Sequence, residues 1–398
     1  MEKKRILIVN KFYYPRGGDC IVAMNLERLL KEQGHEVAVF AMQYHENIDS
    51  GWNQYYASQV DMMGGVSSKI HAFNRIMGLG DIKTSFNRIL NDFKPDIVHL
   101  HNIHSYISPI VAKLAKRQGC RVVWTLHDYK LVCPSYACLL NGRPCEKCIG
   151  HSKTYVTKTR CLKSSIAASS MAYIEVQKWN RYKLESITDA FICPSQFMAS
   201  KMRKDGFNPK KLHVVCNHID PVKLELYNSL NDTHEDFYVY VGRLSTEKGV
   251  ETLLRVASKL PYTLMIAGDG PLMKKLNDIY FGYGNIRFLG HQNAEQVAEL
   301  LSKARFSVVP SEWYENNPLS VIESLCAGTP VVGARIGGIP ELLNENNGIT
   351  FAAGNKNELT NAINKAFVKQ WDNTSIKNLA IKKFSAEEHL RLIEEIYQ

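Results

Sequence analysis

The chain has 398 residues, more than one hydrophobic core usually organises, so its length favours two domains. Hydrophobic residues make up 45% of it and charged residues 22%, which excludes a disordered chain. Lysine and arginine outnumber aspartate and glutamate by 49 to 39, which favours anionic partners. The sequence shows no dense basic block and no familiar nucleic-acid signature, which argues against nucleic acid as a partner.

The start of the chain does not resemble a targeting segment. Its apolar run ends at Val9, which is too short for the core of a signal peptide. No stretch approaches the roughly 18 apolar residues of a spanning helix. We therefore expect a cytoplasmic protein that can also contact an anionic membrane at its inner face. Segment 67–90 mixes apolar residues with lysine and arginine and suits that contact, and a solvated pair of helices explains it equally well.

Short β-rich runs alternate with helix-length segments through the first half of the chain. One such segment, residues 21–34, has apolar residues at helical spacing and a terminal glycine. The runs that we expect to form strands are 5–10, 36–42, 96–101, 121–127, 190–195 and 212–217. This alternation predicts a parallel sheet with crossover helices.

The same alternation restarts after the polar stretch 227–236, so we expect a hinge near residues 217–236. The later runs that we expect to form strands are 237–242, 262–268, 286–290, 305–311, 330–334 and 348–353. The predicted fold class is α/β, with two Rossmann-like doubly wound domains, 1–217 and 218–383, facing each other across a cleft. Ligands of such sheets bind outside the carboxyl ends of the strands.

Residues 315–332, ENNPLSVIESLCAGTPVV, place two carboxylates eight positions apart. Glu315 lies in a loop before an expected helix, which Asn317 could cap and Pro318 could begin. The free amides and the dipole at that helix start can bind an anion. Glu323 lies in an apolar run and needs a partner. Vicinal sugar hydroxyls would fit it, and pairing with a lysine or arginine is the structural alternative.

Residues 240–254, YVGRLSTEKGVETLL, place two cations around a turn after an expected strand. Arg243 as a fork and Lys248 as a point charge could neutralise a diphosphate without a metal ion. No Asp-x-Asp pair, which could hold a divalent ion on such a phosphate, occurs in the sequence. Two solvated surface cations are the alternative interpretation.

Two further segments follow expected strands. Residues 15–19, PRGGD, form a glycine turn where backbone can approach a phosphate or sugar, and they also suit an ordinary turn. Residues 125–129, TLHDY, place His127 at a strand end, where its imidazole could hydrogen-bond a sugar hydroxyl or a leaving-group oxygen.

Three more histidines, His99, His101 and His104, lie near the neighbouring strand end, where a packing role explains each of them as well. Residues 268–273, GDGPLM, lack the third glycine of a dinucleotide fingerprint, and no Walker A pattern occurs. These absences argue against a dehydrogenase and a P-loop enzyme.

A cysteine-rich segment follows the His127 strand. Five of the ten cysteines of the chain lie in or just after it: Cys133, Cys138, Cys145, Cys148 and Cys161. The spacing of Cys145 and Cys148 is typical of a metal ligand pair, whereas Cys133 and Cys138 are too far apart for a zinc ribbon. A structural zinc, reduced thiols in a loop and a disulfide all remain open, and the expected cytoplasmic location disfavours the disulfide.

Taken together, four motifs resemble the retaining GT-B glycosyltransferases of family 4. They are ENNPLSVIE at the E-x7-E position, GRLSTEKG at the G-R-x-x-x-x-K-G position, GGIPELL at residues 337–343, and YYPRGGD near the N-terminus. Their order spans nearly the whole chain. The resemblance implies metal-independent transfer of a hexose-type sugar, with retention, from a UDP or GDP donor. It implies a glycan or lipid-linked glycan acceptor in surface polysaccharide synthesis, and no cofactor besides the nucleotide sugar.

The resemblance also implies roles for individual residues. Arg243 and Lys248 would hold the donor pyrophosphate, Glu323 the ribose hydroxyls and Glu315 the sugar hydroxyls, with His127 beside the donor sugar. The remaining donor-binding residues that it implies are Gly17, Gly18, Leu289, Gly290, His291, Asn316, Asn317, Pro318 and Leu319. The catalytic set would be Glu315, His127, Arg243 and Lys248, with no metal ligand.

The C-terminal segment 384–398 is an amphipathic helix that, by the same resemblance, returns to the first domain. Packing on the second domain is the alternative for this helix. Two other functions stay open at this stage. A nucleotide-sugar epimerase or hydrolase would use Glu315 and Glu323 as acid and base, and a non-catalytic sugar-nucleotide sensor would bind without turnover.

Overall fold

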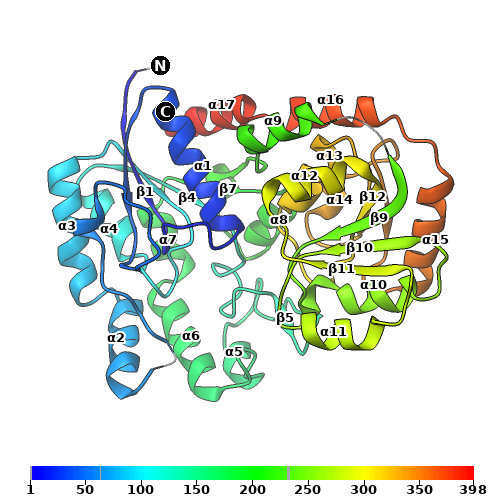
Figure 1. Cartoon of the computed structure of the whole chain (residues 1–398). Helices are drawn as coiled ribbons and strands as arrows, with labels where there is room; N and C mark the ends of the chain where they lie inside the picture. The colour runs from blue at the N-terminus through cyan, green and yellow to red at the C-terminus, as the bar shows by residue number, and fades with distance from the viewer. Residues whose placement is uncertain (1, 63, 231–233) are drawn as a thin grey trace. The chain divides into compact units, whose positions relative to one another are not determined.

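The computed structural model describes residues 2–62, 64–230 and 234–398, which divide into two compact α/β units (Figure 1). The first unit comprises Met1–Cys138, Cys145–Val215 and Leu390–Gln398. The second comprises Leu139–Pro144 and Cys216–His389. Each unit is built around one six-stranded parallel sheet with helices beside it, as a Rossmann-like domain requires.

The sheet of the first unit has the order β2-β1-β3-β4-β7-β8. Its strands are β1 (Arg5–Val9), β2 (Glu36–Phe40), β3 (Ile97–Leu100), β4 (Arg121–Thr125), β7 (Ala190–Cys193) and β8 (Leu212–Val214). β3 and β7 are buried along their whole length, which is why they appear in the sequence as continuous apolar runs instead of alternating ones.

Helices connect these strands. They are α1 (Gly18–Glu32), α2 (Val66–Ile76), α3 (Asp81–Phe93), α4 (Ile110–Arg117), α5 (Tyr155–Lys158), α6 (Ile166–Lys178), α7 (Arg181–Ile187) and α8 (Gln196–Lys204). α8 begins where Ser195 Oγ accepts a hydrogen bond from Met198 N at 3.1 Å, a serine cap directly after β7. Segment 67–90 thus lies in the α2–α3 helical pair.

The sheet of the second unit has the order β11-β10-β9-β12-β13-β14. Its strands are β9 (Glu235–Val241), β10 (Thr263–Ala267), β11 (Ile286–Gly290), β12 (Ala304–Val309), β13 (Val331–Ala334) and β14 (Gly348–Phe351). A small hairpin of β5 (Leu139–Leu140) and β6 (Arg143–Pro144) groups with this unit. Each of the twelve runs expected to form strands overlaps one strand of the two parallel sheets, so that prediction is confirmed.

The helices of the second half are α9 (Pro221–Ser229), α10 (Val250–Ala257), α11 (Met273–Tyr280), α12 (Ala294–Lys303), α13 (Leu319–Cys326), α14 (Ile339–Leu342), α15 (Lys356–Val368), α16 (Asn373–Lys383) and α17 (Ala386–Tyr397). The segment expected to be a hinge contains a helix, α9. Asp220 caps it by accepting a hydrogen bond from Val222 N, and Pro221 occupies its first turn. Residues 231–233 of that segment lie outside the described residues.

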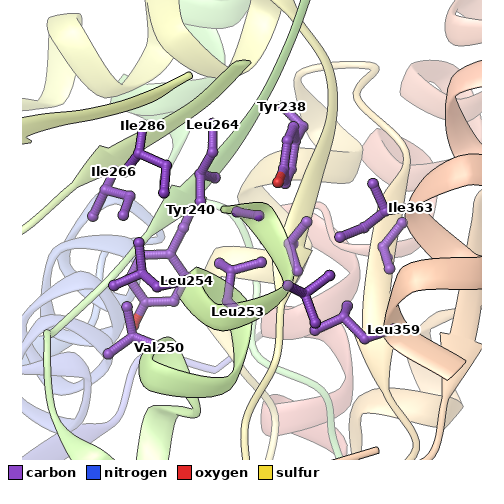
Figure 2. Packing of buried hydrophobic residues seen from close by; sticks show 14 of the residues in the cluster. Tyr238, Tyr240, Val250, Leu253, Leu254, Leu264, Ile266, Ile286, Leu359 and Ile363 are labelled. Carbon is purple, nitrogen blue, oxygen red and sulfur yellow. The ribbon is translucent and has the colours of Figure 1, made fainter. Parts of the chain in front are cut away.

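Two apolar layers hold the second sheet. On one face, α10 and α15 pack against the strands, and Figure 2 shows Leu253, Leu264 and Ile363 among the buried side chains there. A second buried cluster includes Val321 of α13 and Ile376 of α16. Because both faces of the sheet are buried, this is a three-layer domain. Its loops lie at the ends of the strands.

The last helix contributes its final residues to the first unit. The hydroxyl of Tyr397 lies 2.6 Å from His99 Nδ1, and Arg121 Nε donates to the carbonyl of Ile396 at 2.8 Å. His35 Nε2 lies 3.2 Å from Glu394. No helix of the described residues combines the length and the apolar character needed to cross a membrane.

Candidate functional site

The candidate site of the second unit lies where its parallel strands end. β10 and then β11 lie on one side of β9 in the sheet, and β12 lies on its other side. The loops after β9 and β12 therefore leave the sheet in opposite directions, and ligands of open α/β sheets bind at such a reversal. Arg243 and Lys248 follow β9, and Glu315 follows β12.

Gly249 brings the two loops together. Its φ is +70°, and a Cβ at this position would lie 1.9 Å from the carbonyl oxygen of Pro310. Glu312 N also donates to Glu247 O at 2.9 Å, which joins the loops by their backbones. Only glycine allows both this φ and this close approach, so the Lys248–Gly249 step sets the position of Lys248.

Glu315 is a buried carboxylate that meets Lys248 directly. Lys248 Nζ lies 2.6 Å from Glu315 Oε1, and Ser311 Oγ and Trp313 Nε1 donate to the same oxygen at 2.7 and 2.9 Å. Burial raises the pKa of the carboxyl, but Lys248 and the two hydrogen bonds outweigh it, and the pKa lies below its ordinary value. Glu315 is therefore an ionised group with a fixed orientation.

The glycine pair of the GGIPELL motif contacts the backbone of Glu315. Gly337 has φ +61°, and a Cβ there would lie 2.1 Å from the carbonyl oxygen of Glu315. Gly338 N donates to that oxygen at 2.7 Å. This motif therefore fixes the backbone of Glu315, and a larger residue at position 337 would displace it.

The start of α13 corrects one detail of the prediction. The helix begins at Leu319 with Pro318 as its N-cap residue, so Asn317 does not cap it. The side-chain oxygen of Asn317 instead accepts a hydrogen bond from Asn217 N at 2.9 Å, and Asn217 Nδ2 donates to Asn317 O at 2.9 Å. Pro318, the N-cap residue, makes no side-chain hydrogen bond to the first turn of α13.

Glu323 forms an ion pair with a lysine, which was the predicted alternative to binding sugar hydroxyls. Lys223 Nζ, from α9, lies 2.5 Å from Glu323 Oε1, and both side chains are partly exposed. The two residues are 100 positions apart. A sugar hydroxyl at Glu323 would therefore compete with Lys223.

The other sequence-predicted residues of this unit lie along the same strand edge. Arg243 is exposed just after β9, and its carbonyl accepts a hydrogen bond from the Tyr240 hydroxyl at 2.8 Å. Leu289 and Gly290 end β11, and exposed His291 follows them. Asn316 is half-buried beside Glu315. The structure thus gathers this set at the carboxyl ends of β9, β11 and β12.

His127 lies in the first unit, after β4. Its Nε2 is 2.9 Å from His101 Nδ1, and the two rings are stacked at 5.2 Å. Burial lowers the pKa of His127, although Asp19 opposes that shift. A neutral imidazole with one nitrogen held by His101 is suited to hydrogen bonding at neutral pH.

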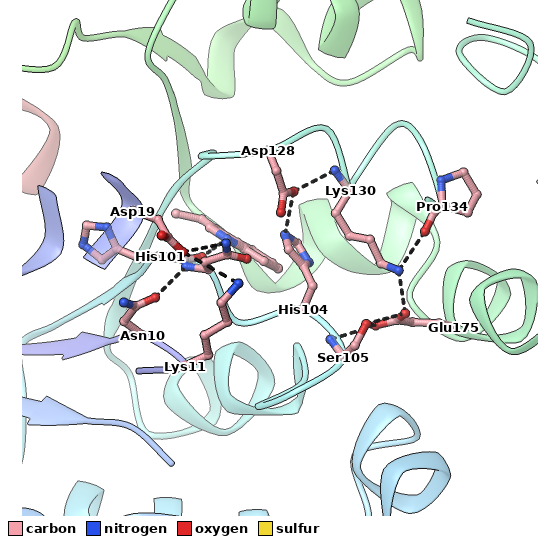
Figure 3. A network of polar contacts seen from close by, with 12 residues as sticks. Asn10, Lys11, Asp19, His101, His104, Ser105, Asp128, Lys130, Pro134 and Glu175 are labelled. Atoms are coloured by element: carbon pink, nitrogen blue, oxygen red, sulfur yellow. Dashed lines mark hydrogen bonds and ion pairs between the residues drawn. The ribbon is translucent and has the colours of Figure 1, made fainter. Parts of the chain in front are cut away.

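A polar network that the sequence analysis missed surrounds this histidine cluster (Figure 3). Asp19 accepts a hydrogen bond from Asn102 Nδ2 at 2.8 Å and lies 3.7 Å from Lys11 Nζ. Burial raises the pKa of Asp128, which faces His104 at 3.8 Å. Asp19 directly follows the glycine pair, and that position was the available signal for it.

The N-terminal glycines have ordinary backbone conformations where they are described. Gly17 precedes α1 with φ −171°, which is extended backbone that any residue adopts, and Gly18 is the first residue of the helix. Backbone strain therefore does not explain the glycine pair, and close approach of a ligand stays a prediction.

The cysteines that suggested a metal are free thiols in this structure. Within the described residues, no group of three or more histidine, cysteine or acidic side chains is arranged to hold a metal ion. Cys133 and Cys138 approach each other, and their thiol hydrogen bond is the main cause that lowers the pKa of Cys133 to about 6. Glu146, between Cys145 and Cys148, pairs with Lys201 and Lys204 of α8.

Comparison with known proteins agrees with the two-unit architecture. Residues 16–223 match the family model Glycosyltransferase Family 4, and residues 226–383 match Glycosyl transferases group 1. The solved structure of Anabaena HepE in complex with UDP and glucose has a TM-score of 0.65, with 17% identity and 98% of each chain covered. The fold is therefore GT-B. Because the first match spans half of the sequence, the chain belongs to glycosyltransferase family 4.

Two curated relatives cover most of the chain. A 42.6 kDa protein from the cps region of Klebsiella pneumoniae is 28% identical over 356 residues, which are 85% of this chain and 87% of that protein. A glycosyltransferase of Methanocaldococcus jannaschii is 27% identical over 361 residues, which are 87% and 84% of the two chains. This chain is accordingly a glycosyltransferase.

Proposed function

We propose that this glycosyltransferase transfers a hexose-type sugar, with retention and without a metal ion, from UDP or GDP to a glycan or lipid-linked glycan. The observation that carries the proposal is the ionised Glu315, held by Lys248 beside the start of α13, where the N-cap residue is a proline. A diphosphate needs cations and amide donors, and the transferred sugar needs an oriented acceptor of hydroxyl hydrogen bonds. This site would supply the cations and amides as well as the oriented carboxylate at the carboxyl ends of neighbouring strands.

The donor phosphates would be bound by Arg243, Lys248 and the first amides of α13, from Leu319 onward. These groups stabilise the negative charge that develops on the leaving diphosphate, which is the largest contribution in such catalysis. Because they are cations and backbone dipoles, they could do so without a divalent ion. Glu315 would accept hydrogen bonds from the sugar, and Glu323 would exchange Lys223 for the ribose hydroxyls.

Further residues would complete the donor contacts. Leu289, Gly290 and His291 would surround the base at the end of β11. Asn316 and Asn317 with Pro318 would shape the loop beside the sugar, and His127 and the Gly17–Gly18 turn belong to the first unit. A neutral His127 could donate to a hydroxyl of the transferred sugar.

A role in surface polysaccharide synthesis is supported by the Klebsiella relative, whose name places it in a cps region. A lipid-linked acceptor would lie at the inner face of a membrane, so peripheral membrane contact is part of the proposal. α2 presents exposed Val66, Ile70 and Phe73 at helical spacing, with Lys69 beside them.

The membrane contact can be tested with vesicles. The protein should sediment with phosphatidylglycerol-containing vesicles and not with pure phosphatidylcholine, because Lys69 and the net charge of +10 favour anionic lipid. The double variant Ile70→Ser, Phe73→Ser should lose this binding. Leu379→Ser, at an exposed apolar residue of α16, is the matched control and should keep it. Equal binding by both variants would contradict the contact.

The donor assignment is tested by thermal shift with UDP, GDP and their sugars in EDTA. A nucleotide that binds only the folded state raises the melting temperature, by the equivalent of about 2.7 kcal/mol at a hundred times its Kd. Arg243→Ala and Lys248→Ala should each weaken binding about tenfold or more, whereas exposed Lys259→Ala should not change it. An unchanged affinity in the first two variants would refute the phosphate assignment.

Turnover distinguishes the remaining functions. Transfer to an acceptor with an unchanged anomeric configuration, read from proton couplings of the product, is expected. Release of free sugar with no transfer would instead favour a hydrolase, and nucleotide binding with no turnover on any acceptor would favour a sensor.

A further inference from the structure

Trp313 contacts both members of the Lys248–Glu315 pair. It is half-buried in the loop that follows β12. Its indole Nε1 donates to Glu315 Oε1 at 2.9 Å, and the ammonium of Lys248 lies 5.2 Å from the centroid of its ring. Glu315 N also donates to the carbonyl of Trp313 at 3.0 Å, so a tight turn joins the two residues. The four sequence motifs give Trp313 no role.

Lys248 has two anionic partners in the proposed reaction. In this structure its ammonium lies 2.6 Å from Glu315 Oε1. A diphosphate carries more negative charge than a carboxylate, so binding of the donor would draw the ammonium toward the phosphates. The carboxylate would then lose its cationic partner at the moment when it has to hold the sugar.

Two neutral donors stay on the carboxylate when the ammonium moves. Ser311 Oγ donates to Glu315 Oε1 at 2.7 Å, beside the bond from Trp313 Nε1. Ser311 is buried, and both donors belong to the same loop as Glu315. A neutral donor is not drawn away by the charge of a phosphate as an ammonium is, and a hydrogen bond to a charged acceptor is stronger than one between neutral groups. The orientation of the carboxylate can therefore outlast its ion pair.

The indole ring offers Lys248 a contact that does not depend on Glu315. A cation is attracted to the face of a tryptophan ring, more weakly than to a carboxylate. The ring would therefore keep the ammonium within the site when the ion pair opens, and it would not compete with a diphosphate for the charge.

We propose that Trp313 is a positioning residue of the transfer reaction: its N–H holds the Glu315 carboxylate for the sugar, and its ring holds Lys248 for the diphosphate. Ser311 shares the first task. The inference rests on the proposed function and adds to it the residue through which one lysine serves the carboxylate in the empty site and the phosphates in the occupied site.

Trp313→Phe separates the two contacts, because it removes the N–H and keeps an aromatic face. It should lower turnover about 10- to 100-fold and leave nucleotide affinity, measured by thermal shift, within about threefold. Ser311→Ala should have the same pattern. Trp313→Leu removes both contacts, so it should also weaken nucleotide binding about two- to fivefold relative to Trp313→Phe.

Trp371→Phe is the matched control in the same unit. Trp371 Nε1 donates to the carbonyl of Ala366 at 3.1 Å, and the ammonium of Lys369 lies 4.2 Å from the centroid of its ring. This variant loses the same kind of hydrogen bond and should keep both turnover and nucleotide affinity. Equal turnover in Trp313→Phe and Trp371→Phe would overturn the inference and leave the donor assignment standing.

The titration of Glu315 gives a measurement that does not need turnover. Lys248 and Tyr240 are titratable groups that interact with Glu315, and burial raises the pKa of Tyr240, which keeps it neutral. The Trp313 hydrogen bond favours the charged carboxylate, so Trp313→Phe should raise the pKa of Glu315. Carbon NMR of protein labelled at the glutamate carboxyls follows this pKa, and Glu315→Gln assigns the signal.

The two measurements separate failure of the inference from failure of the proposed function. A pKa of Glu315 that is the same in Trp313→Phe and the wild type would show that the indole does not hold the carboxylate, whatever the turnover. If that pKa rises but the wild type transfers no sugar to any acceptor, the proposed function fails while the hold of Trp313 on Glu315 stands.

Discussion

Glu315 keeps its negative charge at a position where burial opposes it. Lys248 and two hydrogen-bond donors converge on one of its oxygens, so the charge is compensated within the protein before any ligand arrives. Because breaking a buried pair leaves an uncompensated charge, the two residues depend on each other. A diphosphate that drew Lys248 toward it would release Glu315 to accept hydrogen bonds from the sugar.

Replacing the carboxylate by an amide tests this coupling. Glu315→Gln should lower turnover by about 100- to 1000-fold and leave the affinity for free UDP or GDP within about threefold. It should also destabilise the second unit by about 2 kcal/mol, less than for a fully buried pair because Lys248 is partly exposed. Glu299→Gln, at a surface pair, is the control. Equal losses in nucleotide affinity and turnover would contradict the assignment to the sugar.

The same pair predicts an acid response of known sign. The pKa of Glu315 lies below its ordinary value of 4.5, so the stability from its charge is complete above that pH and is lost as the pH falls through the folded-state pKa. The stability difference between wild type and Glu315→Gln should therefore be constant near neutral pH and shrink below about pH 4.5. Urea unfolding at several pH values measures it, and a difference that grows toward low pH would contradict the lowered pKa.

His104 gives the first unit a second acid-sensitive group. Burial lowers its pKa to about 3 from an ordinary 6.5, so between these values the unfolded chain binds a proton that the folded chain excludes. Stability should fall by up to about 1.4 kcal/mol per pH unit below pH 6.5 from this residue. His104→Gln should flatten the slope and exposed His45→Gln should not. Identical slopes in the wild type and His104→Gln would refute the burial effect.

At the scale of elements, the loops after β9 and β12 owe their contact to a glycine. Gly249 combines a left-handed backbone with a close approach to Pro310, and both needs are specific to glycine. The contact determines where Lys248 lies, although Gly249 carries no functional group. Gly337 likewise combines a left-handed backbone with a close approach to the carbonyl oxygen of Glu315, and so determines where Glu315 lies.

Gly249→Ala should therefore lower the free energy of unfolding of the second unit by about 3 kcal/mol or more, and it should also weaken nucleotide binding. Gly354 is a matched control, because its φ is +74° but a Cβ there would make only ordinary contacts with Glu312. Gly354→Ala should cost about 1 kcal/mol and leave nucleotide binding unchanged. Similar losses in both variants would show that the Pro310 contact is unimportant.

The sequence predicts elements better than it predicts the contacts between them. The twelve strands of the two parallel sheets followed from apolar runs, because strands of a parallel sheet are buried on both faces, whereas the β5–β6 hairpin was not predicted. The start of α13 shifted by one residue because Asn217, 100 positions earlier, holds Asn317. The Lys223 partner of Glu323 also depends on a distant segment. Local patterns carry no information about such pairings.

At the scale of the whole molecule, the end of the chain belongs to the same unit as its beginning. Tyr397 bonds His99 in the middle of the first sheet, and Ile396 and Glu394 bond Arg121 and His35. The chain therefore completes its first unit only with its last nine residues, Leu390–Gln398. Folding of that unit therefore depends on residues that follow the whole second unit in the sequence.

Removing the hydroxyl of Tyr397 tests whether the first unit depends on these last residues, because the stability of each unit can be measured separately. Tyr397→Phe keeps the ring but leaves His99 Nδ1 without this partner, so it should destabilise the first unit by about 1–2 kcal/mol. Amide hydrogen exchange should then quicken in β1, β3 and β4 and stay unchanged in β9 and β12, since the second unit has its own core. Tyr182→Phe, at an exposed tyrosine of α7, is the control and should alter neither sheet. Faster exchange in the second sheet alone would show that the last residues stabilise that unit instead.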